Sequence, residues 1–191
     1  MDYLIAGSVL VAALTALNAA LTAAVLRRWR ARPGVPPAGR DHGPGHPGGA
    51  PHLGIAPGDR MPAFTAATAG GATVTRDDLA GRPALLAFLS LDCPGCDDSV
   101  PELAGLARRV RDAGGRVLAT VVGIDAAGSD LAARLAGVAD HVVPEPLDAP
   151  VGTAFGVRFY PGFAHYGPDG VATAAGVGLQ GLGKAAQPSA P

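Results

Sequence analysis

With 191 residues, the chain has room for one globular domain with appended segments, since domains commonly contain about 100 to 200 residues. Its formal net charge is -1 and 16% of its residues are charged, so no polybasic surface indicates nucleic acid as a partner. The composition divides the chain into an apolar start, a stretch rich in proline, glycine and histidine, and a mixed segment with enough patterned apolar residues for a core.

The chain begins with an apolar segment, residues 3–26, that contains no charged side chain. Because about 20 helical residues cross the hydrocarbon core of a bilayer, this segment predicts a transmembrane helix. A cleaved signal peptide would have basic residues before a shorter apolar run, and a buried helix of a soluble protein would rarely be apolar on every face. We therefore predict a membrane anchor with a basic flank over residues 1–32; the flank contains Arg27, Arg28, Arg30 and Arg32.

Proline and glycine dominate residues 33–58, which carry too little apolar surface to fold and are predicted to form a flexible linker. The linker leads to a globular domain predicted over residues 59–177, and a disordered tail is predicted over residues 178–191. Histidines in the linker could bind a metal weakly, but no cysteine or carboxylate cluster joins them, so we predict no metal site. These histidines are His42, His46 and His52.

The first half of the globular domain shows a hairpin, a strand and a helix in succession. Short β-prone pieces around Phe64 and Val74 predict the hairpin. The short, almost wholly apolar run over residues 84–91 predicts a strand that is buried on both faces of a mixed or parallel sheet. Apolar residues at helical spacing from Cys96 onward predict an amphipathic helix, which Gly114 and the next glycine end.

The second half of the domain alternates strands and helices again and closes with a hairpin. Strands that alternate with helices in this order indicate an α/β sandwich. The predicted elements are a strand over 116–122, a helix from the N-cap Ser129 to about Leu135, a strand at 141–143, a short helix near 150–155, and strands over 162–166 and 171–175.

The chain contains two cysteines, Cys93 and Cys96, at the point where a predicted strand meets a predicted helix. Unpaired N–H groups and the macrodipole at a helix N-terminus favour a thiolate, which is the nucleophilic form of cysteine. Cys96 lies one turn further, within reach to resolve a mixed disulfide on Cys93. A structural zinc site would need two more ligands, and a disulfide across so short a loop would stabilise little. The pair therefore predicts disulfide exchange, with a chance pair of buried thiols as the alternative.

Several segments resemble membrane-anchored thioredoxin-like proteins of the TlpA/redoxin group, and they are also similar to methylamine dehydrogenase accessory proteins. The segments are 57–64, 79–83 and the Cys-Pro-Gly-Cys motif, and the resemblance covers about residues 55–177. It implies a thioredoxin-like three-layer α/β sandwich with a mixed central sheet, preceded here by a single transmembrane helix. It also implies thiol:disulfide exchange that uses a redox-active disulfide and no further cofactor.

In that family, a cis-proline begins a late strand and packs against the cysteine pair, and Pro161 matches its position. Tyr160 precedes it, and an aromatic residue before proline favours the cis form, whereas an ordinary trans proline at a strand start is the alternative. The resemblance therefore implies that the Tyr160 backbone, Pro161, Pro94 and Gly95 bind substrate.

The sequence departs from the family pattern at two places near the cysteines. The buried carboxylate that many thioredoxins carry in the central strand is missing, since Ala87 stands there. Asp92 and the acids that follow Cys96 disfavour a neighbouring thiolate and so oppose the helix effect at Cys93.

Two other functions remain as alternatives at this point. A peroxiredoxin-like peroxidase would carry proline and threonine at fixed offsets before the reactive cysteine, where this chain has Leu86 and Ser90. A non-catalytic tethered binding module is compatible with the missing acid and with a Gly/Ala-rich tail in place of a last helix.

We predict a single-pass membrane protein that reduces disulfides in protein substrates and receives electrons from an upstream donor. Pro94 within the motif resembles oxidising members, but the family expectation for tethered proteins is reduction. The basic flank favours a domain in the cytoplasm, whereas tethered relatives often work outside, so the side of the membrane stays open.

Overall fold

The computed structural model describes Thr15 and residues 52–185, and the fold below is that of the second segment. The transmembrane helix predicted over residues 3–26, its basic flank and the first part of the linker lie outside the described residues, apart from Thr15. Within the described residues, no helix combines the length and the apolar character needed to cross a membrane.

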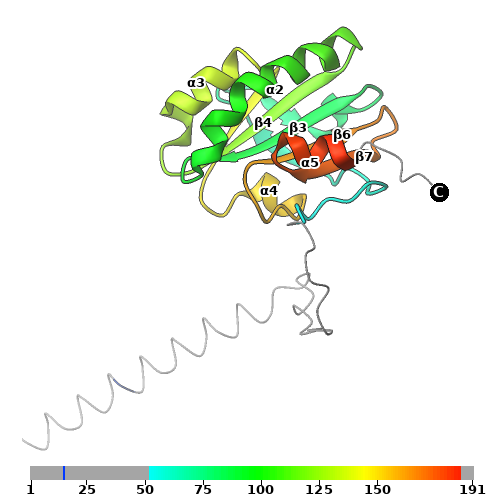
Figure 1. Cartoon of the computed structure of the whole chain (residues 1–191). Helices are drawn as coiled ribbons and strands as arrows, with labels where there is room; N and C mark the ends of the chain where they lie inside the picture. The colour runs from blue at the N-terminus through cyan, green and yellow to red at the C-terminus, as the bar shows by residue number, and fades with distance from the viewer. Residues whose placement is uncertain (1–14, 16–51, 186–191) are drawn as a thin grey trace, which may run out of the picture. The chain divides into compact units, whose positions relative to one another are not determined.

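A five-stranded mixed sheet in the order β5-β4-β3-β6-β7 forms the centre of the domain (Figure 1). Within this sheet β3, β4 and β5 are parallel, and they end in one row because Ser90 pairs with Val122 and Val122 pairs with Glu145. The strands are β3 (Ala84–Ser90), β4 (Arg116–Val122), β5 (His141–Glu145), and the antiparallel pair β6 (Gly162–Tyr166) and β7 (Ala172–Val177).

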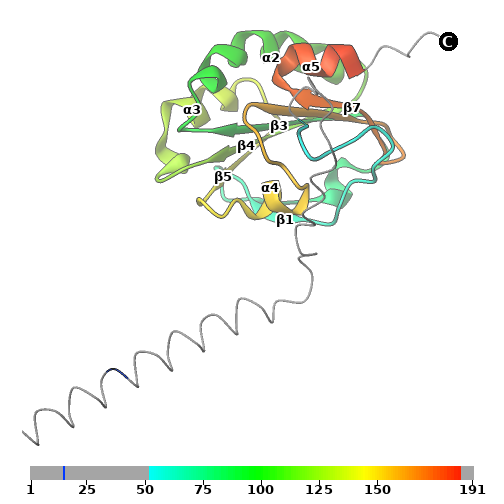
Figure 2. The ribbon, with the colours of Figure 1, turned by 60° about the horizontal axis from the view of Figure 1, so that its bottom comes forward.

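Helices and a small hairpin cover the two faces of this sheet, which gives three layers (Figure 2). One face carries α2 (Pro94–Asp112), α3 (Asp130–Ala136) and α5 (Gly178–Ala185). The other face carries α4 (Pro150–Ala154) and the hairpin of β1 (Thr65–Ala67) and β2 (Thr73–Thr75). Short 3-10 helices over Arg76–Leu79 and Ala126–Gly128 complete the described elements. The predicted α/β sandwich with a mixed sheet is confirmed.

The elements form where the apolar pattern predicts them. All residues of β3 except the last are buried, as expected for a strand covered on both faces. The apolar positions of α2 at helical spacing face the core, and the helix ends just before Gly114, which adopts a φ of 77°. Ser129 is the N-cap of α3, where its hydroxyl accepts a hydrogen bond from the Ala132 N–H at 3.2 Å.

The packed domain begins earlier than the predicted boundary at residue 59. Leu53 and Ile55 are 1% and 3% exposed, and they belong to the core beneath α4. The Arg158 N–H donates to the Leu53 carbonyl at 3.0 Å, which fixes this segment to the loop after α4. The prediction of a linker up to residue 58 was therefore wrong for residues 53–58, because two apolar side chains in a Pro/Gly-rich stretch suffice to anchor it.

A helix also replaces most of the predicted disordered tail. The helix α5 spans Gly178–Ala185, with Leu179 and Leu182 packed on the core that α2 covers. Glycine disfavours helix, so the local sequence predicted disorder, but burial of two leucines one turn apart outweighs this preference. Residues 186–191 lie outside the described residues.

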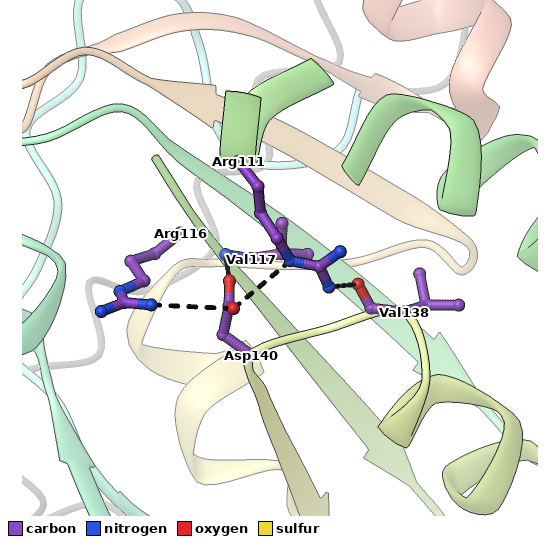
Figure 3. A network of polar contacts seen from close by, with 5 residues as sticks. All are labelled: Arg111, Arg116, Val117, Val138 and Asp140. Atoms are coloured by element: carbon purple, nitrogen blue, oxygen red, sulfur yellow. Dashed lines mark hydrogen bonds and ion pairs between the residues drawn. The ribbon is translucent and has the colours of Figure 1, made fainter. Parts of the chain in front are cut away.

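A polar network connects three elements at the end of the sheet where β4 begins (Figure 3). Asp140 accepts a hydrogen bond from the Val117 N–H at 2.7 Å and forms ion pairs with Arg111 at 3.3 Å and Arg116 at 3.8 Å. Arg111 also donates to the Val138 carbonyl. The last turn of α2, the start of β4 and the turn before β5 are thus held at one point, at the end of the sheet opposite the cysteines.

Candidate active site at the start of α2

The end of β3 and the start of α2 position the two cysteines. Cys93 is the N-cap residue of α2 with extended backbone (φ -110°, ψ 105°), and Pro94 occupies the first turn, where its missing N–H leaves no partner unsatisfied. Cys96 lies one turn into the helix. The predicted meeting of a strand with a helix at the Cys-Pro-Gly-Cys motif is therefore present in the structure.

The two thiols differ in their access to solvent. Cys93 is partly exposed, whereas the Cys96 side chain is fully buried, and both are free thiols. Burial raises the pKa of Cys96 to about 12, and a hydrogen bond with the Cys93 thiol adds to this shift. The Ser90 N–H, which lies 3.4 Å from Cys96 Sγ, opposes it. Such an arrangement suits an accessible sulfur that meets a partner and a buried sulfur that reacts second.

Pro161 faces the cysteine motif from the start of β6. The Tyr160–Pro161 bond is cis, as expected. A Cβ built on Gly95 would lie 3.9 Å from Pro161 Cδ, so the proline sits against the turn between the cysteines. Pro94 and Gly95 are exposed beside it. The structure thus brings together the residues that the sequence predicts for substrate binding, and that role itself remains a prediction.

Tyr160 joins the two halves of the core next to this site. It is partly buried and packs against the apolar clusters on both faces of the sheet. Burial raises the pKa of Tyr160, and repulsion from Glu145, and from Cys96 when that thiol is ionised, adds to the effect. The phenol is therefore a neutral group at neutral pH that lies between the motif and a buried carboxylate.

That carboxylate, Glu145, is the residue that the sequence analysis missed. It is 2% exposed at the end of β5, and it accepts hydrogen bonds from the Val151 N–H at 2.6 Å and the Gly152 N–H at 3.4 Å. Burial raises the pKa of Glu145, and these two hydrogen bonds oppose the shift. The local sequence carries no signal of this burial, because it depends on how α4 packs against the end of β5. The carboxylate holds the first turn of α4 in place. It does not occupy the position in β3 where many thioredoxins carry a buried carboxylate, because Ala87 stands there.

Metal ligands do not gather in the described part of the chain. Residues 52–185 contain no group of three or more histidine, cysteine, aspartate or glutamate side chains that could hold an ion. His165, one of the histidines of the domain, instead pairs through Nδ1 with the Thr173 hydroxyl at 2.8 Å.

The fold and the site define a thioredoxin-like α/β domain with an exposed and a buried cysteine at the start of a helix. A model of the AhpC/TSA family matches residues 57–136. No curated protein matches the chain significantly. Solved structures confirm the fold, among them the thioredoxin domain of a thiol-disulfide oxidoreductase from Bacteroides vulgatus, with 19% identity and a TM-score of 0.58 over 67% of this chain and 93% of that one.

Two further solved structures are somewhat closer in sequence. A putative thioredoxin from Neisseria meningitidis is 29% identical, with a TM-score of 0.53 over 66% of this chain and 85% of that one. A secreted Mycobacterium tuberculosis disulfide oxidoreductase, described as homologous to E. coli DsbE, is 26% identical, with a TM-score of 0.50 over 58% of this chain and 80% of that one. The chain is therefore similar to thiol:disulfide oxidoreductases with a thioredoxin-like fold.

Proposed function

We propose that this protein is a membrane-tethered thiol:disulfide oxidoreductase that reduces disulfides in protein substrates through Cys93 and Cys96. The observation that carries the proposal is the pairing of a partly exposed thiol at the N-cap of α2 with a fully buried thiol one turn on. No cofactor beyond the cysteine pair enters the proposal.

The proposed reaction has two exchange steps. The Cys93 thiolate attacks one sulfur of a substrate disulfide, so a Cys93–substrate bond forms while the substrate S–S bond breaks and the departing thiolate takes up a proton. Cys96 then loses its proton and attacks Cys93 Sγ, which forms the Cys93–Cys96 disulfide and releases the second substrate thiol. The substrate gains two electrons, and an upstream dithiol donor returns two electrons to the protein.

The first experiment traps the mixed disulfide on the full-length protein in a non-ionic detergent. Reduced Cys96→Ser should accumulate a mixed disulfide with a chain of disulfide-bonded insulin or with another disulfide protein, because the resolving sulfur is gone, while Cys93→Ser should lose insulin reduction. Mass spectrometry identifies the adduct, and circular dichroism confirms that each variant is folded. An active Cys93→Ser variant, or a Cys96→Ser variant that forms no adduct, would overturn the proposal.

The AhpC/TSA match keeps a peroxidase as the second candidate. At the offsets where peroxidases of this family carry proline and threonine, the chain has Leu86, which is buried in β3, and Ser90. Consumption of hydrogen peroxide with a dithiol donor separates the two activities: the proposal expects insulin reduction without comparable peroxide turnover. The third reading, a non-catalytic module, loses one of its grounds because α5 forms the last helix.

The tether rests on the apolar residues 3–26 and on the basic flank that follows them. Fusion of a compartment-sensitive reporter to the C-terminus determines the side of the membrane on which the domain works. A cytoplasmic signal would follow the arginine flank, whereas an external signal would follow the family resemblance. Recovery of the full chain in the aqueous phase after detergent partition would contradict the tether itself.

A further inference from the structure

Large apolar side chains are exposed at one edge of the described domain. Those that the structure exposes are Leu91, Ile124, Leu147 and Phe159, with exposed fractions of 37%, 75%, 64% and 44%. Each belongs to a loop rather than to the face of a helix or strand. Exposed apolar side chains that gather at one place commonly mark an interaction surface.

The strand register places all four loops at the end of the sheet that carries the cysteines. Ser90, Val122 and Glu145 pair in one row at the ends of β3, β4 and β5, and β6 begins beside this row because Gly162 pairs with Phe88. Leu147, Ile124, Leu91 and Phe159 therefore follow one another in strand order across the edge. Three interstrand spacings of about 4.8 Å give a span of roughly 14 Å, the length of about four extended residues.

Contacts on either side of the cysteine motif fix the loop that carries Leu91 and the segment that follows Phe159. The Leu91 N–H donates to the Val122 carbonyl at 2.9 Å, and a Cβ built on Gly123 would lie 2.7 Å from Leu91 Cδ1, so Leu91 rests on the loop after β4. On the other side, Pro161 sits against Gly95. The motif with the partly exposed Cys93 thus lies between the loop that carries Leu91 and the segment that leads from Phe159 to Pro161.

Carboxylates surround this row. Asp92, Asp125 and Asp148 are exposed on the same loops, and Asp98 is exposed just after the first turn of α2. The charge of Asp97 is matched by Arg134, with which it forms an ion pair, and Arg158 is the basic side chain next to Phe159. The edge is therefore apolar at its centre and predominantly negative at its rim.

We propose that these four apolar side chains and their carboxylate rim form a docking surface for substrate segments in which large apolar residues and lysine or arginine flank the disulfide. The inference rests on the proposed function and specifies its substrate class. Apolar contacts across about four residues hold the segment in place, and the carboxylates attract its basic residues during approach.

Two synthetic peptides of equal length test this inference. Each carries an intramolecular disulfide and the same apolar residues, but one has lysines and the other glutamates beside the cysteines. The rate of mixed-disulfide formation is measured with the reduced full-length Cys96→Ser protein in a non-ionic detergent. Each rate is divided by the rate of the same peptide with dithiothreitol, because flanking charges also change the intrinsic reactivity of the disulfide.

We expect the basic peptide to react about ten times faster than the acidic peptide at low ionic strength. The ratio of the two rates should approach one near 0.5 M salt, because the salt screens the charges.

Combined Asp125→Asn and Asp148→Asn should lower the ratio of the two rates about threefold. The matched control is Asp112→Asn with Asp169→Asn, two exposed acids at the opposite end of the sheet, and it should leave the ratio unchanged. Combined Ile124→Ser and Leu147→Ser should slow both peptides several-fold.

Dithiodipyridine, a small neutral disulfide, separates the two proposals. If the protein reacts with it but shows no preference between the peptides, or if the control pair lowers the ratio as much as the Asp125 and Asp148 pair, the docking surface is wrong while the exchange activity stands. If Cys93 reacts with neither dithiodipyridine nor the peptides, the proposed function itself fails.

Discussion

At the scale of single residues, burial divides the work between two chemically identical side chains. Cys96 lies in the core that α2 covers and is inaccessible to solvent, whereas Cys93, at the end of the preceding loop, is partly exposed. A buried thiolate is costly because it leaves water without a full set of hydrogen bonds, so the fold favours the protonated form of Cys96. This preference makes the stability of the reduced protein depend on pH.

We predict that the free energy of unfolding of the reduced protein falls as the pH rises above 9, relative to that of Cys96→Ser. The folded state raises the pKa of Cys96 from 9.0 to about 12, so it holds this proton more tightly than the unfolded chain does. The resulting stability is fully present below pH 9 and is lost as the pH approaches 12. Between pH 9 and 10.5 the loss should be about 2 kcal/mol.

Chemical denaturation of both proteins at pH 8, 9 and 10.5 with excess reductant measures this difference. Tyr160 and the other titrating groups are present in both proteins, so their contributions cancel. If the free energy of unfolding changes with pH in the same way for the wild type and Cys96→Ser, the prediction is wrong and the Cys96 thiol is not buried in the folded protein.

Residue spacing predicted the cysteine pair, whereas the family resemblance implied the substrate-binding residues around Pro161. The short spacing of Cys93 and Cys96 at a strand-to-helix junction, and an aromatic residue before Pro161, are local patterns. Glu145 could not be found in this way, since its burial depends on α4 folding back over the end of β5. Local sequence does not record such a contact.

At the scale of elements, the Asp140 network should stabilise the domain without affecting its chemistry. Asp140→Ala should lower the free energy of unfolding by about 2 to 3 kcal/mol, because it leaves the Val117 N–H and the Arg111 guanidinium without their partner. Asp140→Asn should cost less, since an amide oxygen still accepts the Val117 N–H. Denaturant titration measures both.

The matched control for this network is Asp112→Ala, an exposed acid in the last turn of α2, for which we expect a change within about 0.5 kcal/mol. The rate of insulin reduction should stay the same in folded Asp140→Ala, because the network lies at the end of the sheet opposite the cysteines. An equal loss for Asp112→Ala would mean that the observed contacts contribute nothing specific.

The helix α5 gives a second prediction at this scale. Leu182→Ala should lower the free energy of unfolding by about 2 to 3 kcal/mol, because the leucine is 7% exposed and its removal leaves a cavity against the core. Gln180→Ala, an exposed position on the same helix, should have little effect. If both substitutions are neutral in denaturant titrations, the segment is a tail and not a packed helix.

The strands and the long helix were predictable because their apolar residues recur at the period of the element. In β3 and β4 the buried run is continuous, and in α2 the apolar residues follow one face. In α5, glycines outweigh the leucines in any local average, so the helix emerges only when β7 and α2 supply a surface for Leu179 and Leu182. The same holds for Leu53 and Ile55 in the segment before the first hairpin.

At the scale of the whole domain, alternation of strands and helices predicted an α/β sandwich, and the family resemblance implied its three layers and mixed sheet. It did not predict which loops share an edge with the cysteines, because that depends on strand order and register. The order β5-β4-β3-β6-β7 and the common row at Ser90, Val122 and Glu145 bring the loops after three strands to the same side. The cysteine pair and the proposed docking surface thus share one end of the sheet, and the Asp140 network occupies the other.

Packing of the segment around Leu53 also shortens the predicted linker. Residues 53–58 belong to the packed domain, so the linker predicted from residue 33 ends at residue 52 and is six residues shorter than the composition suggests. At about 3.3 to 3.6 Å per residue, the lost reach is roughly 20 Å. With the proposed anchor over residues 3–26, this shorter linker would favour disulfides presented close to the bilayer over those carried by freely diffusing proteins.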